Sequence, residues 1–143
     1  MSAKAAAPFF ENANRQATID YRAGMEQINY QAQRAANSSV HENKLEAISN
    51  MIEMENQNLE RGNRALKILV TDESGKVLYK TKQAQEEQID CIIRFVMQHH
   101  SRLIIQMVEM YLKVQEKSLY LFHLLLLKER ICTCLLAEFQ RER

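Results

Sequence analysis

Histidine and cysteine are the residues of this sequence best suited to metal binding or catalysis, and their spacing argues against both. His99 and His100 are adjacent, so on a helix they point about 100° apart and cannot chelate an ion as an i, i+4 pair does. His123 lies within a run of leucines, as buried structural histidines often do. Cys132 and Cys134 would point about 200° apart on a helix. We therefore expect no metal site, and we interpret these cysteines as small buried hydrophobic residues.

The motifs of common cofactor and catalytic sites are also missing from the sequence. The three glycines, Gly24, Gly62 and Gly75, are isolated, so they form no glycine-rich loop that could bind a phosphate. No serine or cysteine has a base at a recognisable spacing, and the carboxylates are interspersed with basic residues, as on a solvated helix face. We therefore predict a non-enzymatic protein without catalytic, cofactor-binding or metal-binding residues.

Composition and charge restrict the partners. The chain has 143 residues with 19 basic and 18 acidic side chains, a formal net charge of +1, so it lacks the basic surplus of a nucleic-acid-binding protein. The longest uncharged apolar run, Ser118–Leu127, is ten residues long. A membrane span needs about 20, and the lysine- and arginine-rich polar face of a membrane-surface helix is missing. We expect no nucleic-acid partner and no membrane span.

The N-terminus and the cysteines bear on location. No apolar run follows Lys4, so the sequence does not begin like a secretory signal peptide. The three cysteines are an odd number, which is typical of free thiols in a reducing compartment. A cytoplasmic or otherwise intracellular location is expected, and export without a signal peptide is the alternative.

Two helices are predicted in the first half of the chain, at 9–37 and 39–66, after a flexible N-terminus at 1–8. Ser39 and Glu42 fit a capping box at the start of the second helix. Apolar residues of that helix are spaced as in a coiled-coil seam; they are Leu45, Ile48, Ile52, Leu59 and Leu66.

One β-hairpin is predicted, at about 66–81. Two β-prone runs, Ile68–Thr71 and Val77–Tyr79, flank a four-residue turn that ends in Gly75, which tolerates positive φ. An isolated hairpin is marginal in water, so this one must pack on a helix or pair with another chain. The alternative is a helix–loop–helix corner without a sheet.

Residues 83–142 are predicted to be a central helical region. They contain no glycine or proline, and Leu119–Leu127 would be apolar on all sides of a helix. A single helix would reach about 90 Å; two or three helices folded back on each other are the alternative. The predicted fold is therefore mainly α, a helical bundle of coiled-coil type with one small hairpin, in a single domain at 9–143.

The apolar C-terminal region, beside a sparsely apolar first half, predicts a protein–protein interaction. We expect a structural or assembly protein that forms a homo-oligomer or packs on another helical protein. The alternative is a small helical chaperone or adaptor, of the secretion-chaperone type, that shields a hydrophobic client, since the seven methionines suit an adaptable surface. The predicted interface residues are Leu103, Met107, Met110, Tyr111, Val114, Tyr120, Leu121, Phe122, Leu124, Leu125 and Leu127. Strand addition at the hairpin would use Val77, Leu78 and Tyr79.

Overall fold

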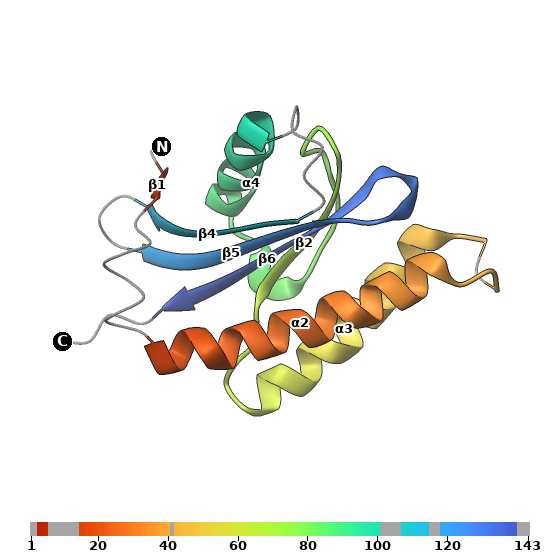
Figure 1. The fold of residues 1–143 in the computed structure, drawn as a ribbon, viewed down its shortest axis with the longest axis horizontal. Coiled ribbons are helices and arrows are strands. Elements are labelled where there is room, and N and C mark those ends of the chain that lie inside the picture. Colours follow the sequence, from red (N-terminus) through yellow and green to blue (C-terminus); the bar gives the residue numbers. More distant parts are fainter. Residues whose placement is uncertain (1–2, 6–14, 41, 101–106, 115–117, 140–143) are drawn as a thin grey trace.

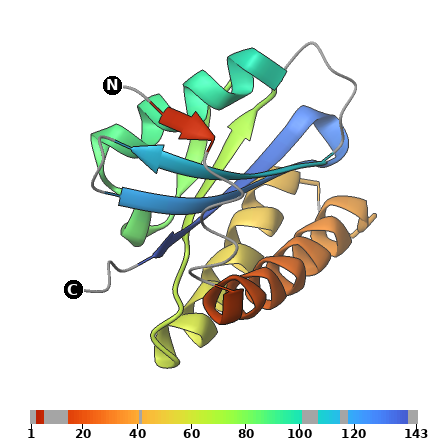
Figure 2. The same cartoon turned by 60° about the vertical axis from the view of Figure 1, so that its left-hand side comes forward.

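The computed structural model of the protein describes residues 3–5, 15–40, 42–100, 107–114 and 118–139. These residues form an antiparallel sheet with helices on both faces (Figures 1 and 2). Helices α2 (Arg15–Asn37) and α3 (Lys44–Arg61) cover one face, and α4 (Glu87–His100) covers the other. Two short 3₁₀ segments complete the helical elements: η1 (Lys82–Ala84) and η2 (Lys128–Arg130). The fold is α+β, so the prediction of a mainly α helical bundle or coiled coil is wrong.

The sheet has six strands in the order β1–β4–β5–β6–β2–β3, and every neighbouring pair is antiparallel. The bounds are β1 Ala3–Ala5, β2 Lys67–Asp72, β3 Val77–Lys80, β4 Met107–Val114, β5 Ser118–Leu126 and β6 Ile131–Phe139. β4, β5 and β6 form a meander, and β2 joins it by pairing with β6. α4 carries the chain across the sheet, from β3 at one edge to β4 near the other (Figure 1).

The predicted central helical region at 83–142 is mostly β-structure. Within its described residues, Glu87–His100 forms the only α-helix, and three strands follow it. Alternate residues of a strand point to opposite faces, and both faces of β5 are covered. Leu121 and Leu125 pack under α2 and α3, whereas Phe122 and Leu124 pack under α4. A strand buried on both faces has no polar side, so its sequence resembles that of a fully surrounded helix.

The turn between β5 and β6 gave no signal in the sequence. Glu129 and Arg130 both have φ near +59°, the left-handed conformation that glycine and asparagine usually supply in tight hairpins. Leu127 N donates to Ile131 O at 2.7 Å and closes the turn. Because two charged residues take this conformation, the long region without glycine contains a hairpin that composition does not reveal.

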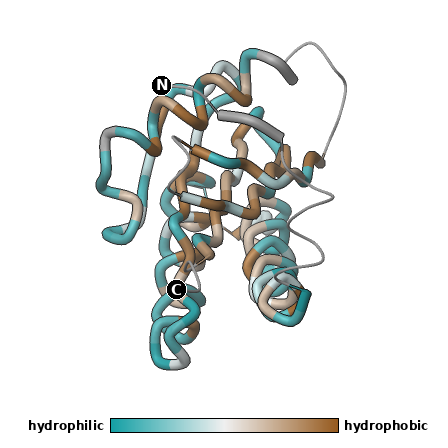
Figure 3. Tube along the Cα trace, turned by 90° about the vertical axis from the view of Figure 1, so that its left-hand side faces the viewer, coloured by the Kyte–Doolittle hydropathy of each residue, from teal (hydrophilic) through white to brown (hydrophobic). Residues whose placement is uncertain are grey.

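Two apolar cores result, one on each face of the sheet. The first joins α2 and α3 to the sheet through Met25, Ile28, Ile48 and Ile52, and the second joins α4 to it through Ile89, Ile92, Ile93 and Val96. Each such fully buried side chain contributes roughly 1.5–3 kcal/mol. Figure 3 shows hydrophobic colour on the strands between the helical layers. Most apolar side chains of β4, β5 and β6 are thus covered by the chain itself.

The first two helices exist near their predicted positions, but they form a hairpin on the sheet. The N-cap of α3 is Asn43, whose Oδ1 accepts from Glu46 N at 3.1 Å, and not Ser39. Gly24 lets the helices approach closely, since a Cβ there would lie 3.3 Å from Leu59. α2 ends at Asn37, as predicted, and the predicted start at residue 9 lies outside the described residues. The predicted bounds of the second helix, 39–66, are too wide at both ends, because α3 runs over Lys44–Arg61.

The predicted hairpin at 66–81 is confirmed as β2 and β3. The Asp72 carboxylate accepts from Ser74 N at 2.9 Å and Lys76 N at 3.0 Å, which orders the turn. The Ser74 hydroxyl is the main cause of the lowered pKa of Asp72. Gly75 has φ of +92°, as the turn requires.

Candidate functional site

Most of the predicted interface residues lie in the protein's own cores. Met107 is 57% exposed and Met110 is half-buried, whereas Leu103 is outside the described residues. The remaining eight are at most 8% exposed: Tyr111, Val114, Tyr120, Leu121, Phe122, Leu124, Leu125 and Leu127. Only Met107 and Met110 of the described set can therefore meet a partner without opening the fold.

These two methionines lie on an incompletely paired edge strand. β1, inside the segment predicted to be a flexible N-terminus, pairs only with Leu112–Val114 of β4. Among the described residues, no strand lies against the outer side of Met107–Met110. We call these four residues the open edge. It carries one charged side chain, Glu109, and such regular apolar edges favour pairing with another chain.

The charge of Glu109 is compensated within the chain. Arg22 on α2 donates from Nε to Glu109 Oε1 at 2.8 Å. Glu109 pairs with His123 across β4 and β5, so both face α2. The open edge is therefore close to electrically neutral.

The opposite edge strand, β3, has features that discourage pairing. An irregularity between Val70 and Thr71 in the β2–β3 register leaves Leu78 as an extra residue, 38% exposed. This places Val77 against the α4 core and Tyr79 against the α2–α3 core, where its hydroxyl donates to Glu53. Burial and this contact raise the pKa of Tyr79. Short, bulged edges resist strand addition, so strand addition at Val77, Leu78 and Tyr79 stays a prediction with weaker support than the open edge.

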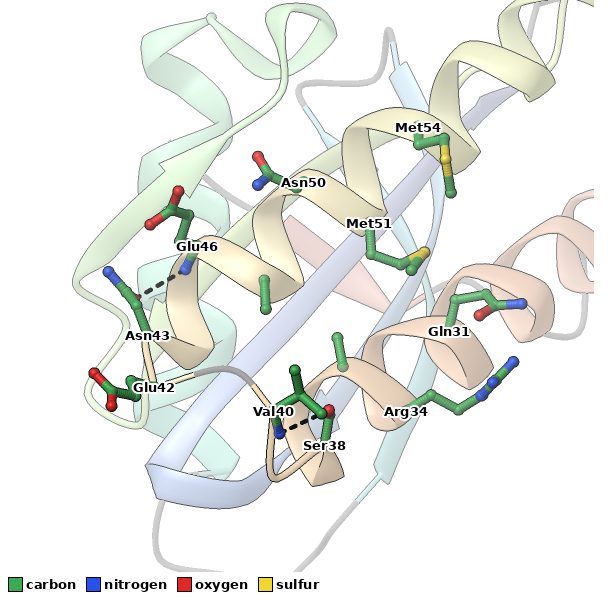
Figure 4. A pocket seen from close by; sticks show the side chains of 12 residues that line it. Gln31, Arg34, Ser38, Val40, Glu42, Asn43, Glu46, Asn50, Met51 and Met54 are labelled. Carbon is green, nitrogen blue, oxygen red and sulfur yellow. Dashed lines mark hydrogen bonds between the residues drawn. The ribbon is translucent and has the colours of Figure 1, made fainter.

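A groove of about 770 Å³ lies between the end of α2 and the start of α3 (Figure 4). We call it the α2–α3 groove. Its apolar lining residues are Ala35, Val40, Ala47, Met51 and Met54, and its charged ones are Arg34, Glu42 and Glu46. Val40 is 83% exposed and Met54 is 51% exposed. The groove therefore offers apolar surface on the helical layer formed by α2 and α3.

His123 belongs to a buried polar cluster, which sequence reasoning missed. Thr133 Oγ1 donates to Asn29 Oδ1 at 2.8 Å, so the Asn29 amide nitrogen faces His123 Nδ1, at 2.9 Å. That nitrogen can only donate, so Nδ1 accepts and the neutral imidazole carries its proton on Nε2. Burial lowers the pKa of His123, and Glu109 and Glu26 partly oppose this effect. The sequence feature that could have indicated this cluster is Asn29, a polar residue on the otherwise apolar face of α2.

Cys132 and Cys134 lie on a strand and not on the predicted helix, but they are buried, as predicted. Cys132 and Cys134 are alternate residues of β6, so both point into the α4 core, and both are free thiols. Burial raises the pKa of Cys132 to about 11 and raises that of Cys134 as well. Within the described ranges, no group of three or more histidine, cysteine, aspartate or glutamate side chains could hold a metal ion.

Comparison with known protein families, curated proteins and solved structures gives a simple result. Nothing matches this chain. The geometry of its own residues therefore carries every functional argument. None of the helices, as far as the chain is described, has both the length and the apolarity needed to cross a membrane.

Proposed function

We propose that this protein is a non-enzymatic assembly protein that self-associates by pairing the open edge, Met107–Met110, with the same strand of a second copy. The observation that carries the proposal is the contrast between the two edges of the sheet. The open edge is regular and mostly apolar, and Met107 is 57% exposed, whereas β3 is bulged at Leu78. Antiparallel addition of a strand would satisfy the backbone groups of the open edge.

Two-fold symmetry suits this edge. In an antiparallel strand pair, two residues that lie opposite each other point to the same face of the sheet. Around a two-fold axis, Val108 can therefore lie opposite Val108 of the second copy. Met107 then lies opposite Glu109, and the two Glu109 side chains are kept apart. The Arg22–Glu109 contact further reduces repulsion between the copies. The continuous sheet would hold Met107 of each copy against Glu109 of the other copy.

Sedimentation velocity over a micromolar concentration series tests the proposal with two matched variants. Met107→Lys adds a charge at the open edge, and Leu78→Lys adds the same charge at β3. We expect Met107→Lys to weaken association at least tenfold and Leu78→Lys to leave it unchanged. A wild-type protein that stays monomeric up to 100 μM would overturn self-association, and the reverse pattern of variants would assign it to β3.

A second candidate function is that of a chaperone or adaptor that shields an apolar client. The observation that favours it is the α2–α3 groove, where Met51 and Met54 provide the adaptable apolar surface expected for such binding. The groove lies on the helices, apart from the residues of the open edge. The two functions can therefore be separated by variants at either place.

A further inference from the structure

The α2–α3 groove is long enough to lie along about three turns of a third helix. From Asn43 to Met54 its lining residues span eleven steps along α3, about 16 Å at 1.5 Å per residue. α2 and α3 form the two walls (Figure 4), and the lining includes the small residues Ala35 and Ala47. Small side chains in a groove between two helices allow close approach by an apolar helix face, as in helix-in-groove recognition.

The apolar part of the groove selects a bulky aliphatic or aromatic side chain. Met51 is half-buried and Met54 is 51% exposed, so the thioethers lie at the solvent boundary. Val40, on the loop between the helices, is 83% exposed. Methionine side chains adapt their shape to an inserted apolar group. We call these apolar lining residues the apolar strip.

The charges of the groove select a basic partner. Glu42 and Glu46 are exposed acidic residues on the α3 side, and within the described ranges neither forms an ion pair. Arg34, the one basic residue among the described lining, lies over the ring of Tyr30 with 5.9 Å between its guanidinium carbon and the ring centroid. Among the described lining residues, two carboxylates stand against one guanidinium, so the groove carries a net negative charge beside its apolar residues.

We infer that the α2–α3 groove binds a basic amphipathic helix of a partner protein, with an apolar side chain between Met51 and Met54 and lysine or arginine beside Glu42 and Glu46. This inference specifies the second candidate function and does not depend on self-association through the open edge. The affinity comes mainly from the apolar strip, and the carboxylates favour basic over acidic sequences. The partner helix covers Met54 and Val40 when it is bound.

Synthetic helical peptides test this inference. The first is a 14-residue amphipathic peptide with leucine at i, i+3, i+4 and i+7 and lysine on the flanks; the second has glutamate in place of every lysine. Binding is followed by fluorescence anisotropy, and the site is mapped by NMR shifts of the Met51 and Met54 methyl groups. We expect the basic peptide to bind at least tenfold more tightly than the acidic one.

Three variants sharpen the test. The double variant Glu42→Lys, Glu46→Lys should reverse the preference between the peptides, and Met54→Glu should weaken both. Glu26→Lys, an exposed acidic residue of α2 outside the groove, should change neither.

Several outcomes would overturn the groove assignment. They are no binding of the basic peptide at millimolar concentration, equal affinity for both peptides, or shifts confined to residues outside the groove. Met107→Lys keeps the two proposals apart, since it should weaken self-association at least tenfold and leave peptide binding intact. If Met107→Lys weakens both self-association and peptide binding, the groove is not a site independent of the open edge.

Discussion

The imidazole Nδ1 of His123 accepts a hydrogen bond from the side-chain amide of Asn29 at 2.9 Å, inside the core between α2 and β5. Thr133 orients that amide, so the pair favours a neutral histidine. Two carboxylates, Glu109 and Glu26, are close enough to oppose the effect of burial on the pKa. The cluster therefore connects α2 to both β5 and β6 and makes its stability depend on pH.

We expect the protein to lose stability as the pH falls below about 6.5. The folded-state pKa of His123 lies below its ordinary value of 6.5, so the unfolded chain binds a proton first. The contribution of neutral His123 to the free energy of unfolding is fully present above pH 6.5. It falls by up to about 1.4 kcal/mol per pH unit between the unfolded-state and folded-state pKa values. Urea unfolding from pH 5 to 8 measures this slope. His123→Gln should flatten it, and an unchanged slope in that variant would contradict the assignment.

Asn29→Ala should destabilise the protein by about 2–4 kcal/mol, because it leaves Thr133 and His123 buried without their partner. Asn37→Ala, at the exposed end of the same helix, should change stability by less than about 0.5 kcal/mol. Thermal and urea unfolding provide the comparison. If the two variants lose similar amounts of stability, the buried cluster contributes no more to the free energy of unfolding than a change in helix propensity does.

One thiol should react in the folded protein. Cys91 is exposed on α4, whereas Cys132 and Cys134 are buried, and their raised pKa values keep them protonated at pH 8. A thiol reagent whose product is measured by absorbance should react quickly with one thiol, and with the other two only after the protein is unfolded. Cys91→Ser should remove the fast reaction. Rapid reaction of all three thiols, or a disulfide between Cys132 and Cys134, would conflict with the strand placement.

Removal of residues 1–5 should strengthen self-association several-fold. β1 covers Leu112–Val114 of β4 through three residue pairs, so its loss lengthens the open edge available to a second copy. Ala5→Pro, which removes one backbone N–H of β1 and keeps the chain length, should act in the same direction and more weakly. Sedimentation velocity at matched concentrations measures both. Weaker association after the deletion would show that the first strand contributes to the contact between copies.

Local signals in the sequence predicted several elements. The glycine that ends the four-residue turn and the flanking β-prone runs located the hairpin of β2 and β3. Helical periodicity placed α2 and α3 near their observed positions, although Asn43 and not Ser39 begins α3. Such elements are predictable because residues within a few positions of each other, through turn chemistry and period, determine them.

The architecture required information that no local window holds. Leu119–Leu127 is apolar on every side in either a helix or a strand, and only pairing with β4 and β6 makes it a strand. The β5–β6 turn uses Glu129 and Arg130 in left-handed conformations, where the sequence offers no glycine. The predicted interface therefore became core, and Met107 remained at the surface because β1 covers only the far end of β4.

Composition and local patterns were enough to establish the apolar content of this chain, its near-neutral charge and the positions of its strongest turn and helices. Tertiary structure alone decided which apolar residues are covered and which polar residues meet in the core, since Asn29 and His123 are 94 positions apart. Burial depends on which segments become neighbours across the sheet. That choice rests on the summed packing of both faces and not on any single segment.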